Sequence, residues 1–415
     1  MNQTDLPRRV VVTGMSAVTA LGFELDEIWR NVVAGKSGIS LVPFLPEDSP
    51  LPTKYAGCID DGKLKNAVET SGIDDPDRGA QFALLAARGA LEHAGFPVDG
   101  SSPMECDVIL GTGHGNIIFH DTAMEAFVKG GWRKLRPTTV VRAMFNRPAN
   151  LISIAYKLTG TSFTVSAACA TGSIAFGTAF NHVRFGLVDR ALAVCADAGI
   201  DPMSFSAWNR LGVLTKHPDP ATACRPFDID RSGLVMGEGA AGMMLESLDS
   251  AQRRGANIIA EVAGYGSSSD ASHIVVPDPK GQVIAVQKAL ASARIEPSEI
   301  DYVNAHGTAT PIADVVEAES LQGSLGDHGR RVPVSNTKAQ FGHLMGATAG
   351  VELVITLLVL QKNEIPPCRN LDNPDPACRL NFVRNMPLKK EINFALKNSF
   401  AFGGANSVVV LKKFR

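Results

Sequence analysis

The stretch V-S-A-A-C-A-T-G, from Val165 to Gly172, is the most informative part of this sequence. It follows a short β-branched run, Phe163 to Ser166, and it leads into a helical pattern from Gly172 to Phe185. A buried strand that ends in small residues and turns directly into a helix is typical of α/β proteins. The turn would hold Cys169 at the helix N-terminus, where unpaired N–H groups and the helix dipole favour thiolate over thiol.

Short apolar runs alternate with helical stretches along the rest of the chain, which predicts an α/β fold throughout. The apolar run near Val351 to Leu360 carries Glu352 and is better explained as a buried helix than as a membrane span. Two successive rounds of strand and helix predict a duplicated architecture, with halves over residues 1–255 and 256–415. We expect strands at Val10–Thr13 (ended by Gly14), Cys106–Leu110, Ala191–Cys195, Ile258–Ala263 and Val408–Leu411, and helices at Arg78–His93 and Leu245–Gly255.

Composition excludes several classes of protein. With 45% apolar and 20% charged residues over 415 positions, the chain has enough apolar surface to fold, so it is not disordered. The net charge of −2 gives no overall field to hold nucleic acid. Residues 1–9 lack an apolar signal core, and no run of ~20 apolar residues could cross a bilayer, so we expect no membrane insertion. Seven cysteines without a C-x-x-C pair indicate a reducing, cytoplasmic compartment.

Two histidines in the second half follow predicted strand ends. The motif N-A-H-G-T-A-T-P places His306 in a Gly/Thr/Pro turn, and N-T-K-A-Q-F-G-H places Lys338 five residues before His343. Side chains at strand ends gather in clefts, so we expect both histidines to face Cys169. A single histidine of this kind is more often structural. Two of them, with a lysine and a cysteine at a strand-to-helix turn, favour nucleophilic catalysis.

Other site classes are less well supported. The segment N-S-F-A-F-G-G-A-N, from Asn398 to Asn406, is either a mobile ligand-contacting loop or a tight turn with packed phenylalanines. G-T-G-H-G, from Gly111 to Gly115, lacks the third glycine of a dinucleotide site in register. No phosphate-binding loop or zinc-ligand spacing is present, so we expect no metal.

These motifs resemble those of the β-ketoacyl-acyl-carrier-protein synthases, the elongating condensing enzymes of the thiolase superfamily. The similarity rests on A-C-A-T-G at Cys169, N-A-H-G-T-A-T-P at His306, and N-T-K-x-x-x-G-H-L-M-G-A at Lys338 and His343. It runs from the opening V-V-V-T-G-M to the closing N-S-F-A-F-G-G-A-N. The resemblance implies a thiolase-like, five-layered α-β-α-β-α fold of two pseudo-symmetric halves. The first half would carry the nucleophilic cysteine and the second the two histidines, in a homodimer.

The resemblance also implies a reaction. Cys169 would accept an acyl group from the phosphopantetheine thioester of an acyl carrier protein. Malonyl carrier protein would then lose CO₂, and its carbanion would attack the acyl-enzyme and lengthen the chain by two carbons. His306 and His343 would donate N–H groups to the thioester oxygen, and Lys338 would orient the site. The substrate-binding residues would be Thr308 and Thr310 for the pantetheine arm, Phe402 as a gate that also offers a backbone N–H, Phe400 and His114.

The family resemblance implies no resident cofactor, because the phosphopantetheine arrives on the carrier protein. In some relatives the positions of Asn304, Glu352 and Asn398 hold a monovalent cation or a structural water network. Carrier proteins are acidic, so a basic rim is expected near the entrance. The best candidates are Arg133 and Lys134, with Arg136 next and with Lys63, Lys65 and Arg210 as weaker ones.

Several residues depart from the family pattern. Ala401 stands where the closing loop normally has glycine, Phe341 where threonine is usual, Ala313 for a glycine and Ala405 for a threonine. A histidine at position 114 is costly in an apolar pocket wall unless it has a polar partner. We therefore expect a specialised acyl substrate that is short, unsaturated or polar.

Three alternatives remain at this stage. An enzyme acting on coenzyme A thioesters would share the cysteine but should replace His343 with asparagine or a second cysteine. A non-catalytic chain-length partner subunit would typically lose Cys169. A cysteine protease would leave the second histidine unexplained.

Overall fold

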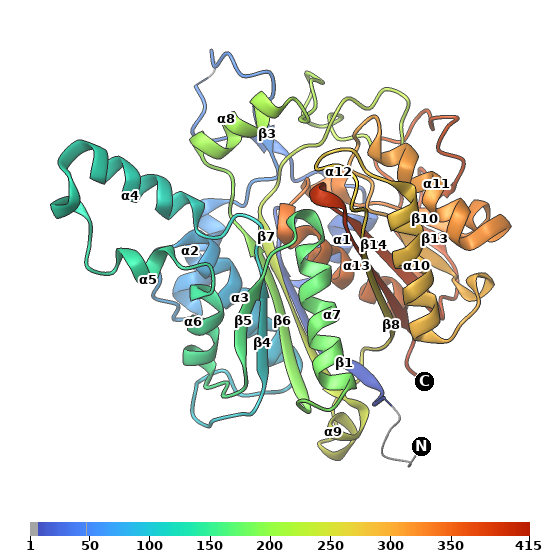
Figure 1. The fold of residues 1–415 in the computed structure, drawn as a ribbon, viewed down its shortest axis with the longest axis horizontal. Helices are drawn as coiled ribbons and strands as arrows, with labels where there is room; N and C mark the ends of the chain where they lie inside the picture. The colour runs from blue at the N-terminus through green and yellow to red at the C-terminus, as the bar shows by residue number, and fades with distance from the viewer. Residues whose placement is uncertain (1–6, 47) are drawn as a thin grey trace.

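The computed structural model describes residues 7–46 and 48–415, so the segment Met1–Leu6 lies outside the described residues. The chain has an α/β architecture in which two half-sheets enclose a pair of buried helices (Figure 1). The strands of the first half are β1 (Val10–Val18), β4 (Asp107–Gly111), β5 (Ser162–Val165), β6 (Arg190–Asp197) and β7 (Gly239–Ser247). Those of the second are β8 (Ala260–Ser269), β9 (Tyr302–Asn304), β10 (Pro333–Ser335), β12 (Asn381–Phe382), β14 (Phe394–Phe400) and β15 (Ala405–Lys412).

The two half-sheets have the same topology. In the first, the order is β1-β7-β6-β4-β5, with two antiparallel pairs followed by two parallel pairs. The second repeats these directions strand for strand in the order β8-β15-β14-β9-β10, and β12 extends its edge. β1 and β8 pair over Val10–Val12, which joins the halves into one 11-stranded sheet. The predicted duplication is therefore present in the pairing itself.

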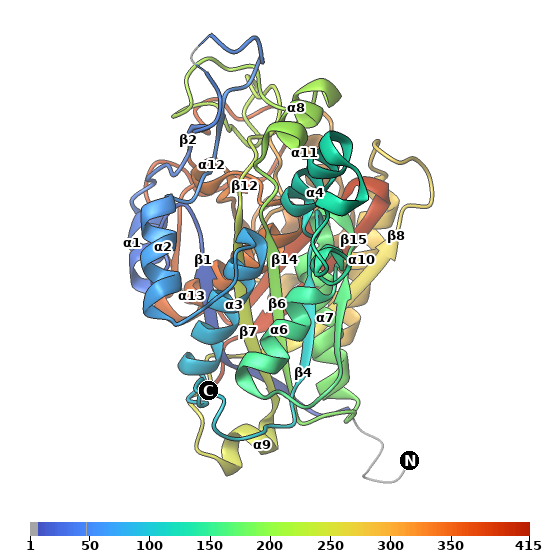
Figure 2. The same cartoon turned by 90° about the vertical axis from the view of Figure 1, so that its left-hand side faces the viewer.

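Helices form three layers around these strands (Figures 1 and 2). α7 (Thr171–Arg184) and α13 (Thr348–Lys362) lie in the centre and contact strands of both halves. α3 (Arg78–His93) and α6 (Arg147–Tyr156) cover the outer face of the first half, and α10 (Pro279–Ala293) and α11 (Ala313–Leu325) cover that of the second. The main apolar clusters follow the same division, with one in the centre and one under each outer pair of helices.

The remaining elements are short or peripheral. α4 and α5 project from the first half as an arm (Figure 1). The helices are α1 (Leu25–Val33), α2 (Asp61–Thr70), α4 (Ile117–Gly130), α5 (Thr139–Ala143), α8 (Pro202–Leu211), α9 (Leu248–Arg253) and α12 (Lys338–Phe341). The strands are β2 (Ser40–Leu41), β3 (Tyr55–Ala56), β11 (Glu364–Ile365) and β13 (Leu388–Lys389), and the 3₁₀ turns used below are η2 (Trp132–Lys134), η3 (Ala168–Ala170), η6 (Met345–Ala347) and η7 (Phe402–Gly404).

Several predicted boundaries were wrong: β8 runs on to Ser269 and not to Ala263, β15 begins at Ala405, and two further cases have a clear physical reason. β1 does not end at Gly14 but continues to Val18 through a register shift. A side chain at Gly14 would lie 2.1 Å from the Ala90 carbonyl oxygen, so the glycine lets α3 pack closely on the strand. The helix predicted from Leu245 begins only at Leu248, because Leu245 to Ser247 end β7. β7 is buried on both faces and so lacks the polar alternation that marks a half-exposed strand.

The central helices cross at two glycines. A Cβ on Gly350 of α13 would lie 2.2 Å from the Cys195 sulfur, and one on Gly172 of α7 would lie 2.8 Å from the Gly350 nitrogen. This close approach brings the N-termini of both buried helices to the same place. The segment Met345–Lys362 has the length and hydropathy of a membrane span, but 89% of it is buried inside the fold. The prediction that this apolar run forms a buried helix is confirmed.

Candidate active site

The predicted strand-to-helix turn at Cys169 is present. η3 links β5 to α7, and Ala168 has a left-handed φ of 45°. The Thr171 hydroxyl holds the turn: it accepts from the Ala167 N–H at 2.7 Å and donates to the Ala168 carbonyl at 2.7 Å. In the second half, η6 precedes α13 in the same way, and Met345 has a φ of 48°. The two turns are therefore equivalent in the duplicated fold.

The Cys169 thiol is more basic than the sequence suggested. Burial raises the pKa of Cys169 to about 11, although the Lys338 ammonium and the Phe402 N–H act in the opposite direction. Backbone N–H groups at the turn do favour the thiolate, as expected, but burial outweighs them. The side chain is 8% exposed, so the resting site holds a neutral, nearly enclosed thiol.

The tautomer of His343 follows from its contacts. Its Nδ1 accepts from the Met345 N–H at 3.1 Å and lies 2.8 Å from the Thr348 hydroxyl. An Nδ1 that accepts a backbone N–H carries no proton of its own, so in the neutral ring the proton is on Nε2. That Nε2 is buried and has no hydrogen-bond partner within the described residues. His343 thus offers an unsatisfied N–H donor.

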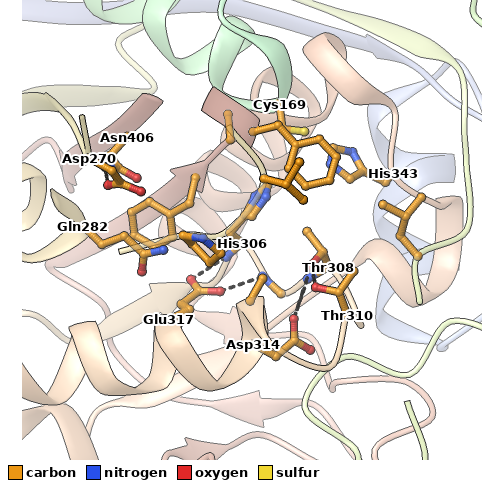
Figure 3. Close-up of a pocket in the computed structure, with 18 of the residues that line it drawn as sticks. Cys169, Asp270, Gln282, His306, Thr308, Thr310, Asp314, Glu317, His343 and Asn406 are labelled. Atoms are coloured by element: carbon orange, nitrogen blue, oxygen red, sulfur yellow. Dashed lines mark hydrogen bonds between the residues drawn. The ribbon is translucent and has the colours of Figure 1, made fainter. Parts of the chain in front are cut away.

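His306 lies in the loop after β9, where Glu317 of α11 fixes the backbone. The two Glu317 carboxylate oxygens accept from the His306 and Gly307 N–H groups at 2.7 Å each (Figure 3). The carbonyl oxygen of His306 accepts from the Asn336 amide at 2.9 Å and from the Lys338 ammonium. The main chain is therefore held from both sides, and the imidazole is left to face Cys169.

Both imidazoles are neutral. Their ring centroids are 5.6 Å apart and their planes are nearly perpendicular, at 87°. Burial, followed by the nearby Lys338 ammonium, holds the pKa of each histidine well below 6.5. A neutral imidazole still donates one N–H, so the pair can stabilise negative charge that develops on a substrate oxygen.

Cys169, His306 and His343 line a single cavity (Figure 3). The Thr308 and Thr310 hydroxyls lie 2.9 Å apart on its wall, and Asp314 accepts from the Thr308 N–H at 3.0 Å. The cavity is also lined by Phe400, Phe402, Trp208, Val275, Gln282 and Asn406. All the predicted binding residues of the second half therefore meet the predicted nucleophile.

The closing loop is a tight turn that contacts the cavity. Phe402 stacks on Trp208 at 6.3 Å between centroids, and its backbone N–H points at the Cys169 sulfur. Gly403 and Gly404 have φ values of 80° and 73°, which favour glycine. Ala401 has a φ of −125°, a conformation that any residue adopts. The alanine at this departure from the family pattern therefore fits without strain.

Lys338 lies behind the cavity wall. Its side chain is fully buried, and its ammonium contacts the His306 carbonyl and a Glu352 oxygen at 2.7 Å. Its contact with the His306 carbonyl is the geometry expected of a residue that orients the site, and this role stays a prediction. The sequence reasoning missed Glu317, Asp314 and Lys397. A polar residue inside an otherwise apolar pattern, such as Lys397 in F-A-L-K-N-S-F, was the available signal.

Comparison with known proteins identifies the family. The models for the N-terminal and C-terminal domains of beta-ketoacyl synthases match residues 7–251 and 259–372. The chain belongs to the β-ketoacyl synthase family. It is 35% identical to 3-oxoacyl-[acyl-carrier-protein] synthase 2 of Coxiella burnetii and to that of Staphylococcus aureus, over 98% of this chain and 99% of each relative.

Solved structures identify the fold. A type II polyketide ketosynthase, solved in complex with its acyl-carrier protein and bound to the hexaketide, superposes with a TM-score of 0.91 at 29% identity. The match covers 98% of this chain and 100% of that one. The thiolase-like fold of a condensing enzyme, predicted from the motifs, is confirmed. This β-ketoacyl synthase is an acyltransferase.

His114 of this β-ketoacyl synthase lies one layer behind the cavity, which is lined instead by Trp208. Its Nε2 lies 3.4 Å from the Trp208 indole nitrogen, and its Nδ1 lies 3.7 Å from an Asp197 oxygen. The Asp197 carboxylate raises the pKa of His114 even though burial alone lowers it. The Trp208 indole N–H is the hydrogen-bond partner of Nε2, whereas Nδ1 is buried without one within the described residues. A direct role in substrate binding stays a prediction.

The predicted carrier-binding residues lie apart from the cavity. Arg133 and Lys134 form η2, directly after α4, and both are exposed. The Arg133 guanidinium lies 5.2 Å from the centroid of the exposed Trp132 ring. This part of the arm therefore presents two cations beside an aromatic surface.

Proposed function

We propose that this β-ketoacyl synthase is a 3-oxoacyl-acyl-carrier-protein synthase that uses Cys169 as its nucleophile. The observation that carries the proposal is the meeting of Cys169, His306 and His343 in one enclosed cavity. The names of the curated relatives and the carrier protein bound to the polyketide ketosynthase support the same substrate class.

In the first half-reaction the acyl group moves from pantetheine to the enzyme. The Cys169 sulfur bonds to the thioester carbon, the carbon–sulfur bond to pantetheine breaks, and the cysteine proton passes to the departing pantetheine sulfur. The N–H groups of Cys169 and Phe402 stabilise the oxyanion. Because one thioester replaces another, no oxidant or external acid is consumed.

In the second half-reaction the malonyl thioester loses CO₂. The electron pair of the broken carbon–carbon bond enters an enolate, whose oxygen lies against the N–H donors of His306 and His343. Each such donor contributes ~2.7–4 kcal/mol in comparable sites. The enolate carbon then attacks the acyl carbonyl and expels the Cys169 thiolate. The expelled Cys169 thiolate, whose thiol has a pKa of about 11, takes up a proton from water, so each condensation consumes one proton and restores the thiol.

The rival functions make different demands on the same residues. A partner subunit needs no nucleophile, whereas Cys169 is present and is held by a dedicated turn. A thiolase-like enzyme on coenzyme A thioesters needs no second histidine, whereas His343 has a free donor in the cavity. The condensing reaction on carrier-bound thioesters uses both features.

We propose that Arg133 and Lys134 bind the acidic carrier protein. Both are exposed and cationic, and neither has an ion-pair partner within the described residues. Alanine at both positions should raise KM for the acyl carrier several-fold and leave kcat unchanged, and the effect should shrink as salt is added. Arg415→Ala, which removes an exposed arginine paired with Glu391, is the matched control. Loss of kcat instead of a rise in KM would contradict this role.

The remaining proposals concern the substrate, the cofactor requirement and the compartment. Trp208 backed by His114 suggests an acyl pocket shaped for a specialised chain, and His114→Ile should change the relative rates for short and long acyl carriers. Unchanged relative rates would refute the pocket idea.

No cofactor beyond the carrier-borne pantetheine is required by the chemistry above. All seven cysteines are free thiols, which fits a cytoplasmic protein.

The decisive experiment is intact-protein mass spectrometry after mixing with a panel of acyl carrier proteins. Wild-type protein should gain the mass of one acyl group, and Cys169→Ala should gain none. His306→Ala and His343→Ala should still become acylated but should release CO₂ from malonyl carrier at least a hundredfold more slowly. If a folded wild-type protein gains no acyl mass from any donor, the condensing function is wrong.

A further inference from the structure

A cluster of three fully buried charges lies behind the catalytic histidines. Glu352 of α13 stands between two lysines, Lys338 of α12 and Lys397 of β14. The Lys338 nitrogen lies 2.7 Å from one Glu352 oxygen, and the Lys397 nitrogen lies 2.9 Å from the other. All three side chains are 0% exposed. One carboxylate is therefore shared by two ammonium groups.

The cluster is linked directly to the active site. The Lys338 ammonium also donates to the carbonyl oxygen of His306. A continuous chain of charge-assisted contacts thus runs from Lys397 through Glu352 and Lys338 to the backbone of His306. Contacts of this kind are strong in a buried site, because no water competes for them.

Lys397 also lies at the position where relatives would hold an ion. It is in register with Asn304 on the neighbouring parallel strand β9, and its ammonium donates to the carbonyl of Asn398. Asn304, Glu352 and Asn398 are the residues at which the family resemblance implies a monovalent cation in some members. In this chain the ammonium contacts both a Glu352 oxygen and the Asn398 carbonyl. The side-chain oxygens of Asn304 and Asn398 are buried without a hydrogen-bond partner within the described residues, so oxygen ligands are present. An ion bound there would have to share the single Glu352 carboxylate with two buried ammonium groups, so the charge of this cluster opposes a diffusible ion.

We propose that Lys397 supplies a built-in cation that replaces the diffusible one. Tethered to β14, its ammonium holds the free oxygen of Glu352, which fixes Lys338 and, through it, the loop that carries His306. Lys397 is therefore a positioning residue for the condensation, and the enzyme does not require sodium or potassium. This inference rests on the proposed function only in that the assay measures the proposed reaction.

The test compares wild type with Lys397→Ala in buffers whose only monovalent cation is the bulky tetramethylammonium. We expect wild-type release of CO₂ from malonyl carrier to be unchanged by added sodium, potassium or ammonium. Lys397→Ala, which removes the ammonium and leaves room for an ion, should lose at least tenfold in kcat with little change in KM. Potassium, ammonium or methylammonium should restore the rate and raise the melting temperature of this variant alone.

Two further variants sharpen the result. Lys397→Met fills the same space without charge, so small cations should not rescue it. Lys412→Ala, which removes a lysine from the partly exposed end of neighbouring β15, is the control and should behave as wild type. Activation or thermal stabilisation of wild-type protein by potassium or sodium would overturn the proposal even if Lys397→Ala fails to fold. Full activity of Lys397→Ala in tetramethylammonium would also overturn it. An inactive wild type would count against the proposed function and not against this inference. The inference would still be tested by the melting temperature of the wild type with and without potassium or sodium.

Discussion

The histidine pair owes its chemistry to burial beside permanent positive charge. An ordinary imidazole becomes cationic when the pH falls through 6.5 and then offers two donors but repels the nearby lysine. Here burial and the Lys338 ammonium hold the pKa of His306 and His343 well below that value. Each ring therefore keeps the same neutral form over the range in which an exposed histidine titrates.

This predicts that the rate of the decarboxylation step does not fall as the pH is lowered through 6.5. A lowered pKa means that protonation begins only at more acidic pH, so CO₂ release from malonyl carrier should be unchanged as the pH falls through 6.5. The measurement is initial rate against pH in a constant-ionic-strength buffer, with circular dichroism to verify folding. A rate that halves near 6.5 would show that at least one imidazole titrates normally.

The raised pKa of Cys169 makes a second prediction at this scale. With a pKa of about 11, the thiolate fraction should rise about tenfold per pH unit between about pH 7 and about pH 9. Alkylation by iodoacetamide, with Cys169→Ala as background, should follow that slope. A plateau near neutral pH would mean that the helix N-terminus and Lys338 outweigh burial after all.

For single residues, the sequence predicted which side chains form the site better than it predicted their protonation states. Cys169, His306 and His343 could be named because small residues and glycines flank them at predicted strand ends. The protonation states could not, since the pKa of each group depends on which charges lie nearby in space. Lys397 is in register with Asn304 only after two distant strands pair, and so its contact with Glu352 is not visible in the order of residues.

Among the elements, the crossing of α7 and α13 decides where Cys169 lies. Cys169 precedes α7 directly, and Gly172 of α7 lets the two helices approach until their N-termini adjoin, while Gly350 of α13 lets that helix pack closely on β6. α3 was predicted to the residue because it is amphipathic, with one buried face and one polar face. β7, which is rich in glycine and alanine and buried on both sides, carries no such periodic signal.

Gly350→Ala should therefore damage both stability and activity. The added methyl carbon would lie 2.2 Å from the sulfur of Cys195 on β6, so α13 must move away from that strand. Overpacking of this kind costs about 1–3 kcal/mol, and the shift should slow acylation of Cys169. Chemical denaturation and the rate of acyl mass gain are the measurements.

The matched control is Gly79→Ala on α3. Its new methyl carbon would make an ordinary 3.8 Å contact with Ala198, so the higher helix propensity of alanine should leave stability equal or increased by up to about 1 kcal/mol. If Gly350→Ala and Gly79→Ala behave alike, the close packing of α13 on β6 is not what positions Cys169.

For the whole molecule, duplication explains why the site forms at the centre. Each half contributes one tight turn before a buried helix, and the pseudo-symmetric crossing brings the turns of Cys169 and Gly346 together. The rounds of strand and helix in the sequence predicted two halves. They did not predict that one sheet would run through both, because the pairing of β1 with β8 involves only Val10–Val12.

A homodimer is also predicted, and we expect its interface at the exposed edge of β5. β5 is the last strand at one edge of the sheet, and all four of its residues are partly exposed. Unpaired sheet edges readily pair with a second chain. Beside this edge Asn150 of α6 approaches Ser162, and Ile154, one helical turn further along the same face, is 66% exposed. A second copy placed against β5 would cover this apolar side chain.

We expect Ile154→Asp to convert a dimer into a monomer. Light scattering after size exclusion should give the mass of two chains for the wild type and of one chain for the variant, because a buried aspartate without a partner opposes association. Met386→Asp is the control, since Met386 is 73% exposed but lies in the second half, away from β5. A wild-type monomer would refute the homodimer, and a dimer that survives Ile154→Asp would place the interface on another face.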